Sequence, residues 1–580
     1  MEPDESSSAS QPTLLEKKTK TTTPPEIDLD VIMSEGEDNG SNGNSNRSWS
    51  FFKLSEVLTD DNLLEDLSQA EDTFVLYQQP WVKDQVPLPL QPSDDFSNAT
   101  NYIKMPFQNN ITIEYHGERV NKWELIKRLL GTTKITSIYQ LEKAIKAYNP
   151  MVGYLDFDIL RSYIHYQLDE DDREYFFDEL LPAIIQLALD LPNIVTCNLP
   201  ILDQDTSTAL FLSQRQISSL MANAFLCTYS QRFKDDRRCI NFTRYYIFSI
   251  LLSNITNHHC PDYRLYSTNR NEKRKSCKLE KIKCFLTYFR RVINSVPTGT
   301  VSFERKRLPA SAARPEESTK KLCRFEINSG QCMFQHGHQF TMVNFANKFI
   351  GGGVLNSGCV QEEILNVLCP ELIVGKLVTE RLADTDAVLI TGAEQFSEYS
   401  GYSDGFKWAG NYRDDDRGMC RDRYGRRLRQ VVAMDALRFA GQAAIEGQYA
   451  KEQIDRELFK AMAAFQGERF LRDHRHRRLP AISTGNWGCG AFNGDPYLKT
   501  LIQVVAASEA GRDLLYFAFN DEQLKRDYRE IRRLLATVQG GGLTVAELYQ
   551  MTLEYGDLRR QVPSLDLLSF LSTKLEPIPF

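Results

Sequence analysis

Residues 343–363 read VNFANKFIGGGVLNSGCVQEE, and the rest of the chain is best understood from this stretch. A short apolar run ends at Phe345 and three glycines follow at 351–353, which is typical of a strand leading into a loop. Glycines let backbone amides approach an anion closely, because no Cβ stands in the way. Glu362 and Glu363 could simply be solvated residues of a first helical turn, where the helix dipole favours acids. That interpretation does not explain why three glycines precede them. Neighbouring carboxylates also point to proton chemistry.

Two further loops contain a similar mixture of glycines and aromatic residues. Residues 483–495 read STGNWGCGAFNGD and precede a helix that is expected to begin at Asp495-Pro496, an N-cap followed by proline. The four glycines of this loop and the helix N-terminus would offer unpaired N–H groups to a phosphate. Residues 391–402 read TGAEQFSEYSGY, and these aromatic side chains either stack on a base or pack in the core.

From about residue 300 onward, short apolar runs alternate with helical segments. This alternation predicts an α/β region with a largely parallel or mixed sheet covered by helices on both faces. Strands are expected at residues 341–345, 387–391, 431–434, 481–483 and 514–519. In such sheets, ligands bind beyond the carboxyl ends of the strands, where the loops after Phe345 and Ser483 lie.

Residues 49–300 have a mainly helical pattern. Ser213 and Gln216 form a capping box before a helically spaced apolar run, and Thr544 with Glu547 predicts another helix start near the C-terminus. The basic run at 270–283 (RNEKRKSCKLEKIK) is interpreted as an exposed loop that enters a helix. A solvated face is favoured for it over contact with a polyanion.

Composition limits the class of protein. The chain has 580 residues, 42% of them hydrophobic, and a net charge of −8, which argues against general nucleic-acid binding. Residues 1–48 are polar and acidic and are expected to be disordered. Lys17, Lys18 and Lys20 form either a nuclear-import signal or part of a solvated tail. With no signal peptide and no C-x-x-C pair, the 12 cysteines are interpreted as reduced thiols of an intracellular protein.

No metal is expected. His258, His259 and Cys260 do not have zinc-site spacing relative to Cys277 and Cys284. An anion-binding glycine loop beside a carboxylic acid is instead suited to cleaving a bond in a phosphorylated sugar.

The three loops, in their order along the chain, resemble the signatures of the poly(ADP-ribose) glycohydrolase family: GGG-x(7)-QEE, TGAEQFSEYSGY and TGNWGCGAFNGD. Residues 216–228 (QISSLMANAFLCT) and 288–303 (YFRRVINSVPTGTVSF) also resemble its helical region. The resemblance covers roughly residues 80 to 555. It implies a macrodomain-like three-layer α/β/α sandwich with a mixed sheet, preceded by an all-helical accessory domain. The expected divisions are a disordered tail at 1–48, the helical domain at 49–300, the catalytic domain at 301–555 and a C-terminal tail at 556–580.

The resemblance assigns roles to the acid pair and its neighbours. Glu363 matches the catalytic acid and Glu362 the neighbour that orients the substrate, while Gln361 and Asn347 match substrate contacts. The family reaction is hydrolysis of the ribose–ribose bond of poly(ADP-ribose) through an oxocarbenium-like transition state. Glu363 would protonate the leaving 2′ oxygen and then deprotonate water, which requires a raised pKa. No cofactor is implied.

The other substrate contacts follow in the same way. Tyr402 resembles an aromatic residue packed on adenine, Phe519 one beside the distal ribose, and Met333 and Phe334 the start of the adenine contacts, although the family usually has an acid at 334. The residues matched to phosphate and ribose contacts are Gly351, Gly352, Gly353, Asn486, Trp487, Gly488, Cys489, Gly490 and Ala491.

Asn344 departs from the family, which usually has Asp at this position. A neutral amide would weaken repulsion near the acid pair, leave Glu363 more acidic, and reduce or acid-shift activity. The alternative function is therefore a poly(ADP-ribose)-binding module with weak or no hydrolysis, and a mono-ADP-ribosyl hydrolase is a weaker third. The expected partner is the polymer, free or on modified proteins, without direct DNA or membrane binding. A monomer in the nucleus and cytoplasm, acting in the DNA damage response, is expected.

Overall fold

Contact clustering divides the chain into Met1–Phe51 and Phe52–Phe580, and everything below concerns the second unit. The computed structural model describes residues 73–75, 103–150, 157–229, 272–328, 333–336, 339–413, 421–469, 479–519, 521–536 and 542–575, with short gaps at 104, 109–110, 197–198 and 205–208. The lysines at 17, 18 and 20 and the tail at 1–48 lie outside these residues.

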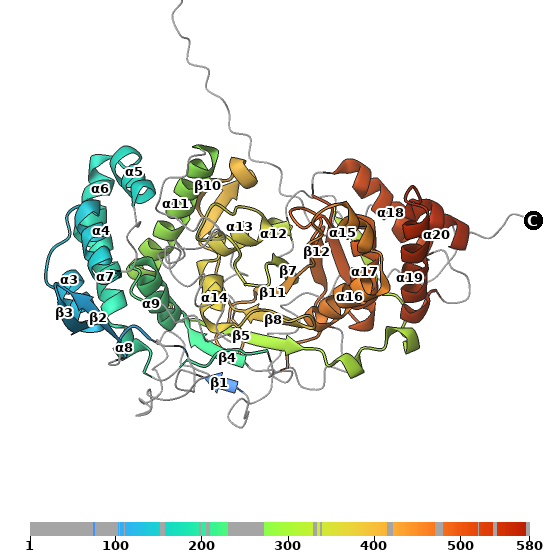
Figure 1. Ribbon diagram of the computed structural model, residues 1–580, viewed down its shortest axis with the longest axis horizontal. Coiled ribbons are helices and arrows are strands. Elements are labelled where there is room, and N and C mark those ends of the chain that lie inside the picture. Colours follow the sequence, from blue (N-terminus) through green and yellow to red (C-terminus); the bar gives the residue numbers. More distant parts are fainter. Residues whose placement is uncertain are drawn as a thin grey trace, which may run out of the picture. The chain divides into compact units, whose positions relative to one another are not determined.

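A nine-stranded mixed sheet forms the centre of the described structure (Figure 1). In spatial order it consists of β1 (Thr73–Val75), β4 (Ala209–Ser213), β5 (Thr300–Arg307), β8 (Asp386–Thr391), β11 (Gln430–Asp435), β7 (Thr341–Ala346), β12 (Ile482–Gly485), β13 (Leu514–Phe517) and β6 (Phe325–Asn328). From β11 to β6 every neighbouring pair is parallel, whereas β4, β5, β8 and β11 pair antiparallel. The mixed sheet and all five strands expected from the sequence are confirmed.

Helices cover the parallel part of this sheet. Helix α16 (Lys451–Phe465) packs on β8 and β11, α13 (Gln361–Leu368) on β7, and α18 (Glu522–Ala536) on β6. Because β7, β8 and β11 have mostly or fully buried residues, the alternating strand and helix pattern of the sequence becomes a sheet covered by helices.

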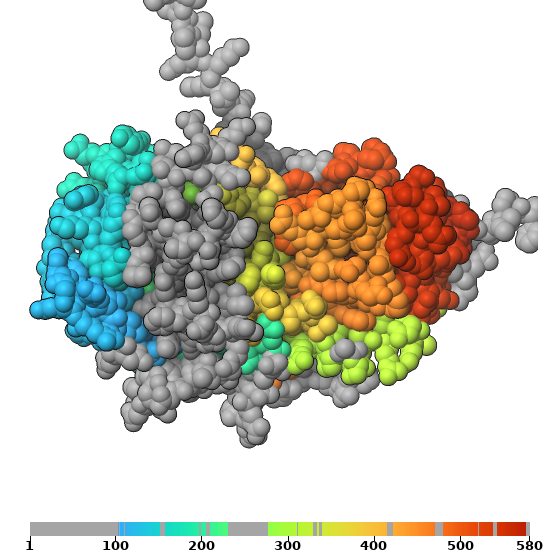
Figure 2. Space-filling model, in the orientation of Figure 1, coloured from blue at the N-terminus to red at the C-terminus, as the bar shows by residue number. Residues whose placement is uncertain are grey.

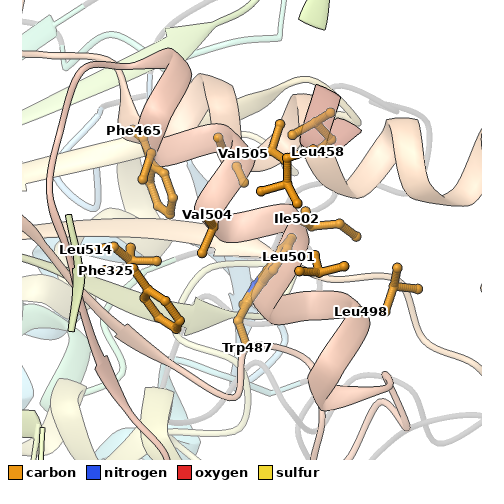
Figure 3. Packing of buried hydrophobic residues seen from close by; sticks show 14 of the residues in the cluster. Phe325, Leu458, Phe465, Trp487, Leu498, Leu501, Ile502, Val504, Val505 and Leu514 are labelled. Carbon is orange, nitrogen blue, oxygen red and sulfur yellow. The ribbon is translucent and has the colours of Figure 1, made fainter. Parts of the chain in front are cut away.

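The core of the α/β region is built around α17 (Pro496–Glu509), which packs on α16. Figure 3 shows Leu501, Ile502 and Val505 of α17 beside the indole of Trp487, which is fully buried. As predicted, Asp495 is the N-cap: its carboxylate accepts the Leu498 N–H. This cap fixes where the helix begins, and therefore how long the glycine loop before it is.

The helical region precedes the sheet in sequence but also contributes to it. Its helices are α3 (Lys122–Gly131), α4 (Ile138–Ala147), α5 (Asp158–Tyr166), α6 (Glu170–Tyr175), α7 (Leu181–Leu189), α8 (Leu191–Ile194), α9 (Gln214–Phe225) and α11 (Glu272–Asn294). The hairpin β2 (Thr112–Tyr115) and β3 (Glu118–Asn121) and the sheet strands β1 and β4 also fall within 49–300, a segment expected to be all-helical. All five residues of β4 are buried, and such a short apolar run has no periodicity that separates strand from helix.

The basic run at 270–283 is not an exposed loop, so that prediction was wrong. Helix α11 already begins at Glu272, and Lys278 and Lys281 within the run are buried. A run of lysines indicates solvent exposure only when no buried acceptors surround it, and acceptors from distant loops are not visible in the local pattern.

The C-terminus also differs from the expected tail at 556–580. Helix α19 (Val545–Gln561) packs on α17, and its predicted capping box at Thr544 and Glu547 is present. Helix α20 (Leu567–Leu575) follows and packs on α18. In the space-filling view the surface of both helices, in red, adjoins the orange surface of the α/β region (Figure 2).

Phe570→Ala tests whether α20 belongs to the folded core. The Phe570 side chain is 4% exposed, so its removal should lower the free energy of unfolding by about 3 kcal/mol. Ser569→Ala, on the exposed side of the same helix, is the control and should change it by less than about 0.5 kcal/mol. Urea denaturation measures both, and equal midpoints for Phe570→Ala and wild type would show that the helix is a dispensable tail.

Candidate active site

A cavity of about 420 Å³ lies where the carboxyl ends of the five parallel strands meet. This is the edge where α/β sheets bind ligands. Its walls come from the segments that follow each strand: Met333 and Phe334 after β6, Phe345 and Ala346 of β7, Ala436 after β11, 485–492 after β12, and Phe517 and Phe519 after β13. Val360, Gln361, Glu362, Tyr399 and Tyr402 complete the lining.

The acid pair lies in the first turn of α13, and both carboxylates accept hydrogen bonds from the backbone of the glycine loop. The Glu362 carboxylate accepts the N–H groups of Gly351 at 2.6 Å and Asn347 at 2.8 Å. The Glu363 carboxylate accepts those of Gly353 at 2.8 Å and Val360 at 3.1 Å. Both residues are buried, and only Glu362 belongs to the residues that line the cavity.

The amides of Gly351 and Gly353 therefore bind the carboxylates, and the contact of these glycines with the substrate phosphate stays a prediction. A Cβ on Gly352 would lie 2.6 Å from oxygens of both Glu362 and Glu363. Gly351 and Gly352 also have φ values of +83° and +40°, which favour glycine. The amide groups do bind an anion, as the sequence suggested, but that anion is the protein's own acid pair.

Burial raises the pKa of Glu362 to about 8, with repulsion from Glu363 as the second cause. The hydrogen bonds from Asn347 and Gly351 oppose this rise, because they stabilise the charged form. At neutral pH the pair therefore retains a proton for a large part of the time.

Asn344, the residue that departs from the family, lies against Glu362. It is buried in β7, and its Nδ2 is 3.5 Å from the Glu362 Oε1 atom. Its Oδ1 atom is buried without a hydrogen-bond partner among the described residues. An amide here donates to the carboxylate, whereas an aspartate would place a third negative charge beside the pair.

Aromatic residues form the opposite part of the lining. The ring of Tyr402 lies 4.9 Å from that of Phe519, and its hydroxyl accepts the Gln361 N–H at 3.2 Å. Phe519 is 48% exposed and has a φ of +55°, which is uncommon for a bulky residue and frequent at functional sites. Phe334 packs edge-on against Tyr399 at 5.7 Å.

Of the two donor groups predicted for the loop after β12, the loop amides and the helix N-terminus, the second is already occupied. The Asp495 carboxylate already caps α17, so the helix N-terminus is occupied by a protein anion. Within the described chain, the N–H groups of Gly488, Gly490 and Ala491 are not taken by backbone carbonyls. These three residues line the cavity, so their amides are candidate anion donors.

Trp487 and the 391–402 loop combine core and lining roles. The Trp487 indole is buried and donates to the Met434 carbonyl at 3.1 Å, so it anchors the glycine loop. In the 391–402 loop, Glu394 is buried and pairs with Arg291 of α11, while Tyr399 and Tyr402 line the cavity. One half of that loop therefore packs in the core and the other half lines the cavity, while stacking on a base stays a prediction.

The structure brings most of the predicted site residues to one cavity. Those that line it are Met333, Phe334, Gln361, Glu362, Tyr402, Asn486, Trp487, Gly488, Cys489, Gly490, Ala491 and Phe519. Asn344, Asn347 and Gly351 donate to Glu362, Gly353 donates to Glu363, and Gly352 packs against both carboxylates. The sequence reasoning missed the lining residues Phe345, Ala436 and Phe517, whose only signal was their place at strand ends.

No group of three or more His, Cys, Asp or Glu side chains in the described residues is arranged to hold a metal ion. His258, His259 and Cys260 lie outside those residues.

None of the helices described is both long and apolar enough to cross a membrane.

Gly352→Ala tests whether the carboxylates impose the glycine. The new methyl group would meet both acids at 2.6 Å, so the loop or the acids must shift, and we expect unfolding free energy to fall by about 1–3 kcal/mol. The control is Gly447→Ala, in α15 (Gln442–Gly447), where a Cβ meets nothing within 4 Å and stability should rise slightly. Equal melting temperatures for the two variants would refute this explanation of Gly352.

Two family models match the chain in succession. The helical-domain model of poly(ADP-ribose) glycohydrolase matches residues 168–305, and the macro-domain-fold model of the same family matches residues 312–526. Both the helical region and the α/β region are thus accounted for by one family.

Similar proteins are found in Arabidopsis thaliana. Poly(ADP-ribose) glycohydrolase 1 of Arabidopsis thaliana is 30% identical over 465 residues, covering 68% of this chain and 80% of that protein. Probable poly(ADP-ribose) glycohydrolase 2 of the same plant is 28% identical, covering 70% and 84%. A crystal structure of the Thermomonospora curvata poly(ADP-ribose) glycohydrolase is 20% identical and covers 38% of this chain and 84% of that one, with a TM-score of 0.20. On the two family models and the plant relatives, this chain belongs to the poly(ADP-ribose) glycohydrolase family.

Proposed function

We propose that the protein hydrolyses ribose–ribose O-glycosidic bonds in poly(ADP-ribose) and releases ADP-ribose. The observation that carries this proposal is a buried acid pair, held by backbone amides, of which Glu362 lines a cavity that is also lined by aromatic rings and a glycine-rich loop. A volume of about 420 Å³ is within the range of small-molecule sites and suits one terminal ADP-ribose unit.

In this proposal each wall of the cavity recognises one part of that unit. Tyr402 and Phe519 pack on the adenine and ribose, because aromatic faces stack on bases. The amides of Gly488, Gly490 and Ala491 bind the diphosphate. These contacts hold the glycosidic bond next to the acid pair. Binding of the ADP-ribose unit therefore orients the bond that is to be broken.

Glu363 is the proposed general acid and base. Its proton passes to the 2′ oxygen of the leaving ribose as the glycosidic C–O bond breaks and an oxocarbenium-like sugar forms. The resulting carboxylate then takes a proton from the attacking water, which completes hydrolysis and restores the acid. Glu362, whose pKa is raised by burial, orients the sugar at the cavity wall.

Glu363→Gln should lower kcat for polymer hydrolysis by about 10²- to 10⁴-fold, because the amide cannot transfer the proton. Binding of ADP-ribose, which depends on the aromatic and glycine-rich walls, should change little. Release of ADP-ribose from purified polymer measures kcat, and calorimetry measures binding.

The control for this experiment is Glu452→Gln, at the exposed start of α16, which removes one carboxylate far from the site and should leave kcat unchanged. Comparison with Glu362→Gln tests which acid transfers the proton. If Glu363→Gln turned over like wild type while Glu362→Gln did not, Glu362 would be the acid. Tight polymer binding by wild type without any product would favour a binding module.

Asn344→Asp should make the enzyme active to higher pH. A third carboxylate at about the 3.5 Å position of the Asn344 amide would repel charge on the pair and raise its pKa. The acid would then stay protonated to higher pH, and the alkaline limb of the kcat profile should move up by roughly one pH unit or more. Asn344→Ala removes the amide without adding charge and serves as the control. Superimposable pH profiles for Asn344→Asp and wild type would contradict the electrostatic role.

We also propose that the protein acts in both the nucleus and the cytoplasm, as part of the response to DNA damage. The support is the basic cluster of Lys17, Lys18 and Lys20 in the N-terminal segment, which suits an import signal. Imaging a fluorescent fusion with these lysines changed to glutamine tests this, since an unchanged nuclear fraction would exclude the cluster as the signal.

A further inference from the structure

Two buried lysines donate hydrogen bonds to the backbone carbonyls of the glycine loop, whose N–H groups bind the carboxylates. The proposed mechanism does not use these lysines. Lys376 lies in α14 (Val374–Val378) of the α/β region, and Lys281 lies in α11 of the helical region. The two residues are 5% and 0% exposed. Buried ammonium groups are rare unless they are well solvated by the protein, so their surroundings indicate what they hold.

Lys376 acts on the peptide groups that also bind the acids. Its Nζ atom donates to the carbonyl of Ile350 at 3.0 Å and to that of Gly352 at 3.1 Å. The N–H groups of the same two peptide planes belong to Gly351 and Gly353, which donate to Glu362 and Glu363. In a trans peptide the C=O and N–H point in opposite directions, so each plane links the lysine on one side to a carboxylate on the other.

The charged groups that act on Lys376 are the two acids whose hydrogen-bond donors it orients. Glu362 and Glu363, both of α13, are the charged groups that favour its ammonium form, while burial lowers its pKa to about 8. The side chain also packs closely on the loop, because a Cβ on Gly351 would lie 2.9 Å from its Cγ and Cδ atoms. The lysine is thus both a cation and a packing surface for the loop.

Lys281 holds the second half of the same loop. Its Nζ atom contacts four carbonyl oxygens: Gly353 at 3.4 Å, Val354 at 3.1 Å, Asn356 at 2.9 Å and Gly358. In the described residues no carboxylate pairs with it, so the loop carbonyls are what solvate its charge. The chain from Gly353 to Gly358 therefore curves around an ammonium group supplied by another region of the protein.

We propose that Lys376 and Lys281 are positioning residues that fix the acid pair for catalysis by orienting the peptide groups of the glycine loop. Lys376 aims the N–H groups of Gly351 and Gly353 at the carboxylates. Lys281 fixes residues 353–358, whose far end leads to Val360, the last donor to Glu363. Proton transfer would then depend on the helical region, although no residue of α11 lines the cavity.

This proposal rests on the proposed hydrolysis, and its first test separates binding from turnover. Lys376→Met and Lys281→Met should each lower kcat for polymer at least tenfold, with KM and ADP-ribose affinity within about threefold of wild type, because the base and diphosphate contacts lie on other loops. Lys525→Met is the control, since this lysine of α18 is also buried but pairs with Glu522 away from the loop. It should leave kcat unchanged.

Two further measurements detect effects that lost stability would not produce. Lys376→Met removes the cation facing the pair, so the pKa of the acids should rise and the alkaline limb of the kcat profile should move to higher pH. Amide hydrogen exchange without substrate should become faster at Gly351 and Gly353 in Lys376→Met, and at 353–358 in Lys281→Met, while exchange in α17 stays as in wild type.

The results separate this inference from the proposed function. If the wild-type protein did not hydrolyse the polymer, the proposed function would be overturned. The hydrogen-exchange experiment would still test whether the two lysines fix the glycine loop. Wild-type kcat in both variants, or unchanged exchange at 351–353 and 353–358, would overturn the positioning role. Equal losses of kcat and of ADP-ribose affinity would also overturn it, because they would indicate general damage to the fold.

Discussion

Two adjacent carboxylates buried at the start of one helix are the constraint on which the site depends. Charged or half-charged acids cannot remain buried without donors, and the donors here are backbone amides of a loop that must come within 3 Å of both. That closeness excludes a side chain at Gly352. The loop carbonyls consequently point away from the carboxylates and accept hydrogen bonds from two buried lysines, Lys281 and Lys376.

The sheet topology places this constraint beside a binding cavity. Five parallel strands end at one edge, and each contributes residues to the same cavity, so segments far apart in sequence become neighbours. Glu362 connects the two systems, because it is held by the loop and also lines the cavity. The acid pair and the cavity therefore meet at Glu362.

The helical region is joined to the α/β region by buried polar contacts as well as by its strand β4. Gln214 of α9 donates to Glu371 at 2.8 Å, and Arg291 of α11 pairs with Glu394. Glu371 in turn accepts the Glu394 N–H at 2.7 Å. Since removing one partner of a buried network leaves the others unsatisfied, these contacts oppose independent movement of the two regions. Lys281 of α11 also connects the helical region to the glycine loop.

The sequence by itself determined four of the five parallel strands, β7, β11, β12 and β13, but not β6. It also determined the helix starts at Ser213, Asp495 and Thr544 and the three loops of the site, because apolar periodicity, capping and glycine clusters are local signals. Only the tertiary structure decided which groups those loops serve. The glycine amides bind Glu362 and Glu363, and the Asp495 carboxylate caps the N-terminus of α17. Lys281, in a run predicted to be exposed, is buried and donates to the loop carbonyls. Each of these depends on partners distant in sequence, and local patterns contain no information on such partners.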